Sequence, residues 1–326
     1  MIISKTPFRI SFFGGGTDFP SYYEKFGGEV ISTSINKFCY VQLNNLDEIY
    51  KYNYRLVWSK NETVFDINKI QNPCIKAALK YKKVKQRIEL HYSADLPKNS
   101  GLGTSSSFVV GLLNCISALN NKKISHKQLA SEAINVEQKI LKEFCGSQDQ
   151  VQAAYGGFNM IEFKKNQNHQ VNKIQITENI KKNLQNNLLL IYTNQQRYSG
   201  TIEKEKINQI ENNHELYHQI RKLTPIAKLF LLKNNIQDFG KLLNDYWILK
   251  TKLSKKVSNK TIDEISKVVL NCGAYGTKVL GSGGGGFVLA VCDPKFHKNI
   301  KKKLYKLNFV NFSLYNQGSK IIYSDK

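Results

Sequence analysis

The hydrophobic and polar positions along the chain change period at one place, which predicts a strand, a loop and a helix in succession. Residues 88–97, IELHYSADLP, alternate as a strand does and stop at Pro97. Residues 107–120, SFVVGLLNCISALN, are apolar on nearly every side and are long enough for a buried helix. Residues 99–107, NSGLGTSSS, form a glycine-rich loop between them. Such a loop presents free N–H groups and the positive end of a helix dipole to an anion.

A second helix is predicted to begin after Ser125, because Gln128 three residues later completes a capping box. Glu137 lies on the apolar stripe of this helix, where a carboxylate is costly unless it is paired or binds a metal. The alternative is a partly exposed glutamate or one paired with a lysine. Gly146 and Ser147 should end the helix. The stripe consists of Leu129, Ala130, Ala133, Ile134, Leu141 and Phe144.

Asp149 follows this helix and opens a stretch with few charges. Taken alone, it would be interpreted as a helix cap. Next to an anion-binding loop and a buried acid, it acquires a second interpretation. Phosphoryl transfer from a nucleotide needs a phosphate cradle, a divalent cation and a carboxylate that orients the attacking hydroxyl.

Glycine clusters occur at three distant places, Phe12–Phe19, Asn99–Ser107 and Val279–Val291. One cluster would indicate only a turn, but three favour repeated close approach of the backbone to a ligand. The middle cluster is neither a Walker A loop nor a dinucleotide-binding GxGxxG motif. A serine-rich helix cap without a ligand is the alternative, although one cap needs one hydroxyl and this loop has four: Thr104, Ser105, Ser106 and Ser107.

Composition excludes some classes of protein but does not indicate a function. A chain of 326 residues with 41% hydrophobic residues predicts a globular protein of about two domains. The apolar stretches are too short to cross a bilayer, and the N-terminus does not resemble a signal peptide, so we expect a cytoplasmic protein without a membrane partner. The six cysteines lack CxxC spacing, which favours reduced, mostly buried thiols over disulfides or a zinc site.

The net charge of +23 comes from 43 lysines and only five arginines. Nucleic-acid recognition favours arginine for its planar fork, so we expect no nucleic-acid partner. A positive exterior would nevertheless attract phosphorylated small molecules.

Three motifs resemble those of the GHMP small-molecule kinases, the superfamily of galactokinase, homoserine kinase, mevalonate kinase and phosphomevalonate kinase. They are TPFRISFFGGGTDFPSYY (Thr6–Tyr23), PKNSGLGTSS (Pro97–Ser106) and KVLGSGGGGF (Lys278–Phe287), in the family's order. The resemblance implies a two-domain α+β fold, with a ribosomal protein S5 domain 2-like part in residues 1–180 and a ferredoxin-like part in residues 181–326. ATP and Mg²⁺ would bind in the cleft between the two.

The resemblance also implies residue roles. Asp149 would be the catalytic carboxylate, Arg9 would stabilise the reacting groups, and Ser105 and Glu137 would hold Mg²⁺. The nucleotide-binding residues would be Pro97, Ser100, Gly101, Leu102, Gly103, Thr104, Ser105, Ser106, Gly283, Gly284 and Gly285. The substrate-binding residues would be Gly14, Gly15, Gly16, Thr17 and Asp18. Arg197 and Lys250 are further candidates to hold a substrate phosphate, with a solvated side chain as the alternative.

Within the superfamily, DYWILKTKLSKKVSNKTIDEI and the following NCGAYGTKVLGSGGGGF resemble the D-glycero-D-manno-heptose 7-phosphate kinases. The resemblance implies phosphorylation of the anomeric C1 hydroxyl to a 1,7-bisphosphate for surface polysaccharide precursors. Galactokinases have Gly-Glu-His where this chain has Gly14, Gly15 and Gly16, a change expected to remove a negative charge and open space. A kinase for fucose or another hexose and a non-catalytic sugar or nucleotide sensor stay open. We expect a small sugar or sugar phosphate as partner and leave a homodimer open.

Overall fold

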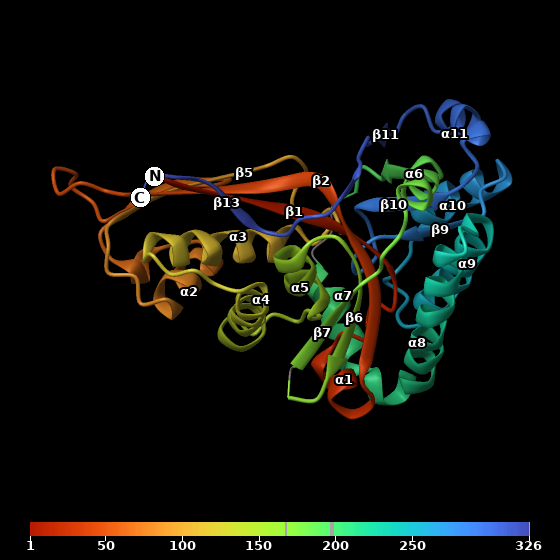
Figure 1. The fold of residues 1–326 in the computed structure, drawn as a ribbon, viewed down its shortest axis with the longest axis horizontal. Coiled ribbons are helices and arrows are strands. Elements are labelled where there is room, and N and C mark those ends of the chain that lie inside the picture. The colour runs from red at the N-terminus through yellow and green to blue at the C-terminus, as the bar shows by residue number, and fades with distance from the viewer. Residues whose placement is uncertain (167, 196–198, 326) are drawn as a thin grey trace.

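The computed structural model describes residues 1–166, 168–195 and 199–325, in which helices and strands alternate irregularly (Figure 1). The larger sheet contains β1 (Ile2–Phe13), β2 (Gly28–Asn45), β3 (Tyr54–Val57), β4 (Asn61–Val64), β5 (Ile88–Ala94), β6 (Phe158–Lys164), β7 (Asn168–Lys173), β12 (Leu314–Tyr315) and β13 (Lys320–Ser324). The smaller sheet contains β8 (Leu188–Tyr192), β9 (Gly276–Val279), β10 (Phe287–Val291) and β11 (Asn308–Phe309). The α+β prediction is confirmed.

The helices fall into two groups. Those of the first half are α1 (Pro20–Phe26), α2 (Pro73–Tyr81), α3 (Thr104–Leu119), α4 (His126–Ile134) and α5 (Gln148–Tyr155), with the short turns η1 (Ile67–Lys69) and η2 (Asn135–Ile140). Those of the second half are α6 (Glu178–Asn186), α7 (Ser199–Asn208), α8 (Ile210–Leu232), α9 (Ile236–Thr251), α10 (Lys260–Asn271) and α11 (His297–Lys303), with η3 (Pro294–Phe296).

Strand β2 organises the larger sheet because its 18 residues are long enough to pair with different strands at its two ends. Its first part, Gly28–Thr33, pairs with β6, and its last part, Cys39–Asn45, pairs with β5. Strand β1 pairs antiparallel along most of β2. In the sheet order β13-β1-β2-β5-β3-β4, β1 lies between β13 and β2.

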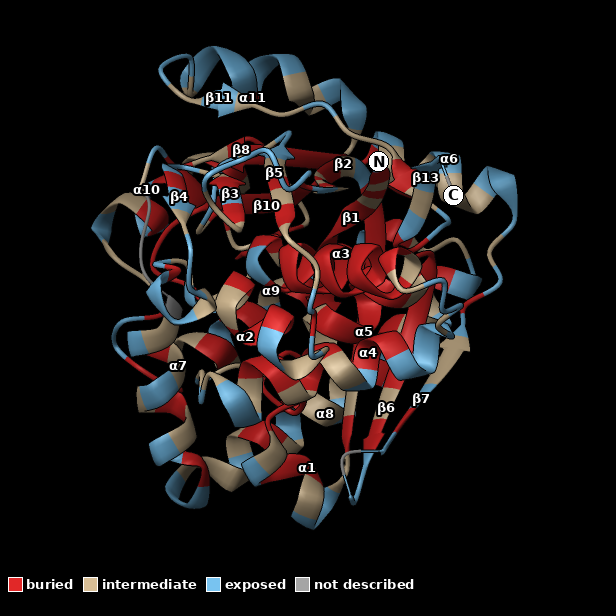
Figure 2. Ribbon diagram, turned by 90° about the vertical axis from the view of Figure 1, so that its left-hand side faces the viewer, coloured by how far each residue is buried: buried red, intermediate tan, exposed pale blue. Residues whose placement is uncertain are grey.

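Helix α3 is the predicted buried helix, and it packs under the sheet (Figure 2). Nearly all of its residues are buried, because the sheet covers one side and α2, α4 and α5 lie around the other. The helix approaches β1 closely at Gly111, where a Cβ atom would lie 2.8 Å from the Thr6 hydroxyl oxygen. This packing fixes the N-terminus of α3 relative to β1.

The smaller antiparallel sheet has the order β11-β8-β10-β9 and its own core cluster. The predicted division at residue 180 needs one correction. Strand β12 pairs with β2 and strand β13 pairs with β1, so the chain returns to the first sheet after completing the second. The two chain ends consequently lie together at one end of the molecule (Figure 1).

The second predicted helix begins as expected but ends early. The Ser125 side chain accepts from the Gln128 N–H, which is one half of the predicted capping box, while the Gln128 side chain donates to Glu132. Helix α4 stops at Ile134, however, and residues 135–140 form a π-helical turn, η2. The stripe interpretation is wrong at its far end, because Phe144 lies beyond this turn and is 41% exposed. All six cysteines are free, and four of them are buried.

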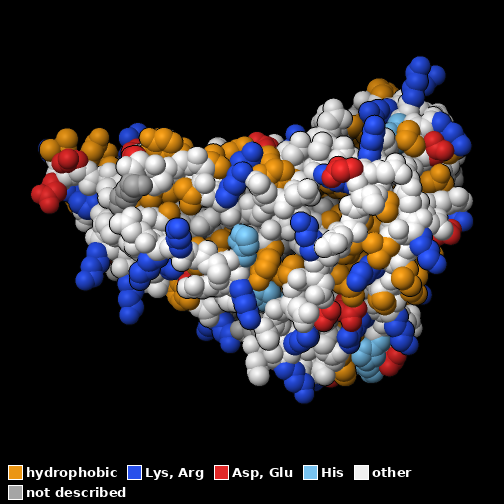
Figure 3. Space-filling model, viewed as in Figure 1, with side chains coloured by type: hydrophobic (Ala, Val, Ile, Leu, Met, Phe, Trp, Pro, Cys, Tyr) orange, Lys and Arg blue, Asp and Glu red, His pale blue; other side chains and the backbone are white. Residues whose placement is uncertain are grey.

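Lysine and arginine side chains are scattered over the face shown in Figure 3 rather than gathered in one patch. Across the described parts of the chain, the helices are too short or too polar to cross a membrane.

Candidate active site

A cavity of about 530 Å³ lies where the three glycine clusters meet. Strand β1, the starts of α3 and α5, the η2 turn, α7, α9 and the loop after β9 all contribute to its wall. Most predicted site residues line it, namely Arg9, Gly15, Gly16, Asp18, Gly101, Gly103, Thr104, Ser105, Ser106, Glu137, Asp149, Lys250, Gly283 and Gly285. Segments far apart in the sequence thus converge on one space.

The loop before α3 has the geometry of an anion cradle. Gly101 and Gly103 have φ values of +80° and +74°, which glycine adopts without strain. Gly103 is the N-cap of α3, and no side chain caps this helix. The free N–H groups of the first turn therefore remain for a ligand, and the serine-rich cap is not what the hydroxyls form. The Ser107 hydroxyl instead donates to the Pro7 carbonyl.

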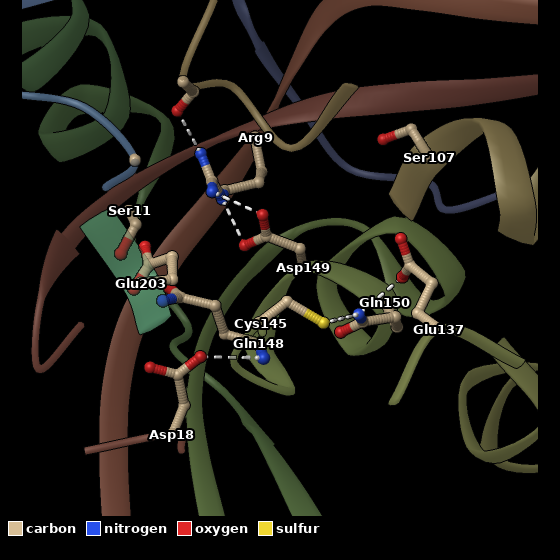
Figure 4. A network of polar contacts seen from close by, with 12 residues as sticks. Arg9, Ser11, Asp18, Ser107, Glu137, Cys145, Gln148, Asp149, Gln150 and Glu203 are labelled. Carbon is tan, nitrogen blue, oxygen red and sulfur yellow. Dashed lines mark hydrogen bonds and ion pairs between the residues drawn. The ribbon is translucent and has the colours of Figure 1, made fainter. Parts of the chain in front are cut away.

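Arg9 and Asp149, which both line the cavity, form a bidentate ion pair (Figure 4). The Arg9 Nε and Nη2 atoms donate to the two Asp149 carboxylate oxygens at 2.8 and 2.6 Å. A third bond, from Nη1 to the Gly101 carbonyl at 2.6 Å, ties the pair to the anion cradle. Arg9 is only 4% exposed, whereas Asp149 is 23% exposed. The carboxylate is thus the partner that remains accessible from the cavity.

Glu137 is the predicted buried acid, and it is 1% exposed. Gln150 and Ser106 are hydrogen-bonded to its carboxylate, while no lysine, arginine or histidine among the described residues pairs with it. Burial raises the pKa of Glu137 to about 8. The paired-lysine alternative is therefore excluded for residues 1–166, 168–195 and 199–325.

A bound cation would supply the positively charged partner that the Glu137 carboxylate lacks among the described residues. Mg²⁺ in phosphoryl-transfer sites takes one or two protein oxygens and completes its shell with phosphate oxygens and water. Glu137 and the hydroxyls at the start of α3 fit that requirement. Ser105 is exposed and lines the cavity, as its expected role demands, but it is Ser106 that touches Glu137.

Three residues of the first glycine cluster, Gly14, Thr17 and Asp18, make contacts that stabilise the loop itself. Gly14 does not line the cavity, and a Cβ there would lie 1.9 Å from the Glu29 carbonyl oxygen. The Thr17 hydroxyl donates to the carbonyls of Gly14 and Glu29. Asp18 lines the cavity, yet its two oxygens accept from the N–H groups of Gly16 and Gln148. Burial raises the pKa of Asp18. These contacts hold the loop against the start of α5.

The expectation that Gly15 and Gly16 open space is wrong. A Cβ on Gly16 would lie 2.8 Å from the Tyr217 ring, and one on Gly15 would lie 3.1 Å from the Tyr246 hydroxyl. Two buried tyrosines of α8 and α9 fill the room that larger side chains would need. Both glycines still face the cavity through their backbone.

The third glycine cluster meets the second through bare backbone. Gly281 lies against Gly101, where a Cβ on either residue would come within 2.4–2.7 Å of the other loop. The N–H of Gly284 donates to the Val257 carbonyl, which anchors this loop to the turn after α9. Of the predicted nucleotide-binding residues, Pro97, Ser100, Leu102 and Gly284 do not line the cavity. Arg197 lies outside the described residues.

Sequence reasoning missed several polar residues that line the cavity, among them Ser11, Gln148, Glu203, Lys206 and Lys278. Strand periodicity could have found Ser11, because it lies two residues after Arg9 and so on the same face of β1. The Glu203–Lys206 pair has helical i, i+3 spacing and an Oε2–Nζ distance of 2.7 Å. Nothing in a chain with 43 lysines marks Lys206 or Lys278 as buried.

The fold and this cavity define a nucleotide-dependent small-molecule kinase. Residues 68–157 match the family model described as GHMP kinases N terminal domain, and residues 226–309 match GHMP kinases C terminal. The chain belongs to the GHMP kinase family, whose members use ATP.

One similar protein is the D-glycero-alpha-D-manno-heptose 7-phosphate kinase of Campylobacter jejuni, which is 31% identical over 94% of this chain and 93% of its own length. A solved D-glycero-D-manno-heptose 1-phosphate kinase from Bacteroides thetaiotaomicron has the same fold, with a TM-score of 0.82 at 23% identity and coverage of 99% and 100%. The mevalonate kinase of Methanococcus jannaschii aligns with a TM-score of 0.73 at 25% identity, over 96% of this chain and 98% of that one.

Proposed function

We propose that this protein is an ATP- and Mg²⁺-dependent sugar kinase that phosphorylates the C1 hydroxyl of D-glycero-D-manno-heptose 7-phosphate. The product would be the 1,7-bisphosphate, a precursor for surface polysaccharide. The observation that carries the proposal is the Arg9–Asp149 pair, which faces the same cavity as the anion cradle and Glu137. The heptose relative from Campylobacter supports the choice of sugar.

The acceptor hydroxyl would approach Asp149 from the cavity. Each carboxylate oxygen accepts one bond from Arg9 and has a further lone pair for a proton donor. Asp149 would orient the C1 hydroxyl and accept its proton as the hydroxyl oxygen bonds to the γ-phosphorus of ATP. The bond from that phosphorus to the β–γ bridging oxygen would break, and ADP would leave. Arg9 would hold that carboxylate in place and stabilise the charge that develops on the transferring group.

The nucleotide phosphates would lie on the free N–H groups at the start of α3. Glu137, with Ser105 or Ser106, would hold Mg²⁺ next to them. When bound there, Mg²⁺ would neutralise part of the negative charge of the phosphates. The loop at Gly281–Gly285 would cover the same phosphates from the second half of the chain.

A panel of acceptors tests this proposal. ADP release is measured with heptose 7-phosphate, the unphosphorylated heptose, mannose, fucose, galactose and mevalonate. We expect the highest kcat/KM with heptose 7-phosphate and a product whose new phosphorus resonance couples to the anomeric proton. Preference for fucose or another hexose would replace the substrate and keep the reaction class. Binding of sugar or nucleotide without turnover of any acceptor would favour a sensor.

A further inference from the structure

Two polar side chains in the wall of the cavity have buried hydrogen-bonding atoms without a partner. Ser11 on β1 is 4% exposed, and its hydroxyl has no hydrogen-bond partner among the described residues. The side-chain carbonyl oxygen of Gln148, in the first turn of α5, is also buried and has no partner there. Both residues line the cavity. A buried polar atom without a hydrogen bond costs about 1–3 kcal/mol, so a partner from a bound molecule would offset that cost.

The lack of a partner does not by itself define a binding site. Ser117 on α3 is 1% exposed, and its hydroxyl also has no partner within the part of the chain that the structure describes. Ser117 does not line the cavity, however, and lies among the buried residues of α3. Ser11 and Gln148 differ from it because they lie against a space that a ligand can enter.

The two side chains converge at the backbone of Gly15, which faces the cavity. A Cβ added to Gly15 would lie 3.4 Å from the Gln148 Nε2 atom and 3.8 Å from the Ser11 hydroxyl oxygen. The same point would lie 3.1 Å from the Tyr246 hydroxyl oxygen, and Tyr246 donates to the Gly15 carbonyl. Three polar side chains, from β1, α5 and α9, therefore meet at one place in the wall of the cavity.

Both side chains lie close to the Arg9–Asp149 pair. Ser11 follows Arg9 by two residues on β1, so the two side chains project from the same face of the strand. Two residues of extended strand span about 6.6 Å, a distance comparable with the length of a pyranose ring. Gln148 directly precedes Asp149 in α5, and Figure 4 shows its side chain between the Arg9–Asp149 pair and Asp18. A sugar whose reacting hydroxyl is at Asp149 would therefore bring other hydroxyls to Ser11 and Gln148.

The chemistry of the two unpartnered atoms defines the group that they can bind. The Gln148 carbonyl oxygen only accepts hydrogen bonds, whereas the Ser11 hydroxyl both donates and accepts. A neutral hydroxyl satisfies both atoms, because it carries a proton as well as lone pairs. An ionised carboxylate or phosphate has no proton to donate to Gln148, and the Asp18 carboxylate is already hydrogen-bonded to the Gln148 N–H. This place in the cavity wall is therefore suited to a sugar hydroxyl rather than to an acidic group.

We propose that Ser11 and Gln148 bind a hydroxyl of the acceptor other than the one that reacts, and that they thereby select polyhydroxylated acceptors. This subsite rests on the proposed function, because it requires an acceptor hydroxyl at Asp149. A site that hydrogen-bonds a substrate hydroxyl discriminates against analogues that lack it, because its buried polar atoms are then left unpaired. Ser11 and Gln148 are thus specificity-determining residues, and any phosphate on the acceptor lies elsewhere in the cavity.

The variants Ser11→Ala and Gln148→Leu test the subsite, because each removes the polar atoms and nearly keeps the size of the side chain. Loss of a neutral hydrogen bond predicts that kcat/KM for the acceptor falls roughly 3- to 10-fold in each variant. The KM for ATP should stay within about twofold of wild type. The matched control is Ser117→Ala, which should retain the wild-type kcat/KM. The melting temperature of Ser11→Ala should not fall, because the hydroxyl that it loses has no partner among the described residues.

Deoxy analogues of the acceptor identify the hydroxyl that is bound. For wild type and Ser11→Ala, kcat/KM is measured with the acceptor and with analogues that each lack one of its other hydroxyls. One analogue should be a poor substrate of the wild type, and Ser11→Ala should lower its kcat/KM little further, because the effects of removing two interacting partners are not additive. Additive losses with every analogue would overturn the assignment. A raised KM for ATP with unchanged use of the acceptor would place Ser11 at the nucleotide instead.

The same measurements separate failure of this inference from failure of the proposed function, because they use whichever acceptor of the panel has the highest kcat/KM. If a hexose replaces heptose 7-phosphate and Ser11→Ala still lowers its kcat/KM, the subsite stands and the proposed substrate is wrong. If heptose 7-phosphate is the best acceptor and neither variant changes its kcat/KM, the substrate stands and the subsite is wrong. If no acceptor is turned over, calorimetry with each sugar decides. Weaker binding to Ser11→Ala than to wild type supports the subsite, and equal or absent binding overturns it.

Discussion

The substitution Asp149→Asn removes one negative charge from the cavity and leaves the shape of the side chain almost unchanged. In the wild type, both carboxylate oxygens accept from Arg9, at 2.8 and 2.6 Å. Asparagine offers one acceptor oxygen, and its NH₂ group would point a donor at a guanidinium that has only donors. Arg9, at 4% exposure, would then keep its charge with only neutral partners, the Gly101 carbonyl and the one amide oxygen.

Two effects of different size should follow. Breaking a fully buried ion pair costs about 3–5 kcal/mol. Because Asp149 is 23% exposed, we expect a loss of about 2–3 kcal/mol, which for a chain of 326 residues lowers the melting temperature by roughly 3–5 °C. Loss of a positioned base should lower kcat about 10²- to 10⁴-fold. The catalytic loss should therefore far exceed what partial unfolding at 25 °C could cause.

The assay measures kcat at 25 °C with saturating ATP and heptose 7-phosphate, alongside thermal unfolding and ATP binding. Asp238→Asn is the matched control, because Asp238 lies on the surface of α9 and is 42% exposed. It should retain wild-type kcat and lose no more than about 0.5 kcal/mol. A folded Asp149→Asn protein with kcat within threefold of wild type would show that Asp149 is not the base.

Three further substitutions test other parts of the cavity. Glu137→Gln should weaken Mg²⁺-dependent ATP binding about 10-fold or more, measured by titration at several Mg²⁺ concentrations, and an unchanged Mg²⁺ requirement would exclude Glu137 as a ligand. Burial lowers the pKa of Lys250 to about 7, so the free-energy cost of burying its charge is fully present below pH 7. This cost declines as the pH rises toward 10.5, the ordinary pKa of lysine. The stability advantage of Lys250→Met over wild type should accordingly shrink between pH 6 and pH 9, and a constant difference in melting temperature would contradict the burial argument. Gly101→Ala would place a Cβ 2.4 Å from the Leu280 carbonyl oxygen and should weaken ATP binding. Gly157→Ala is the control and should retain ATP binding, because its φ is nearly the same but its nearest atom lies at 3.4 Å. Equal ATP affinity in both variants would mean that neighbouring atoms move aside for the Cβ at position 101.

Local patterns predicted the elements that form the glycine-rich loop and the Glu137 side of the cavity. The change from strand to helix periodicity located β5 and α3, and the apolar stripe placed Glu137 on a buried face. These features depend on neighbours in sequence, so they are visible without a structure. The same reasoning failed at Phe144, because a π-helical turn changes the period within the stripe.

The side of the cavity that contains the buried lysines depends on contacts between distant segments. Three different elements contribute the buried lysines Lys206, Lys250 and Lys278, although lysine normally lies on the surface. The packing of Tyr217 against Gly16 joins residues about 200 positions apart. The return of β12 and β13 to the first sheet is equally remote. Such burial is decided by tertiary packing, which no local period records.

The π-helical turn at Asn135–Ile140 has a consequence for the evolution of this segment. A π turn holds one residue more than an α turn, and each α-helical residue rotates the chain by about 100°. Deleting any one residue here would let the turn rewind as α-helix and swing Glu137 away from Ser106. Insertions and deletions in this short stretch should therefore be far more harmful than substitutions at its exposed positions.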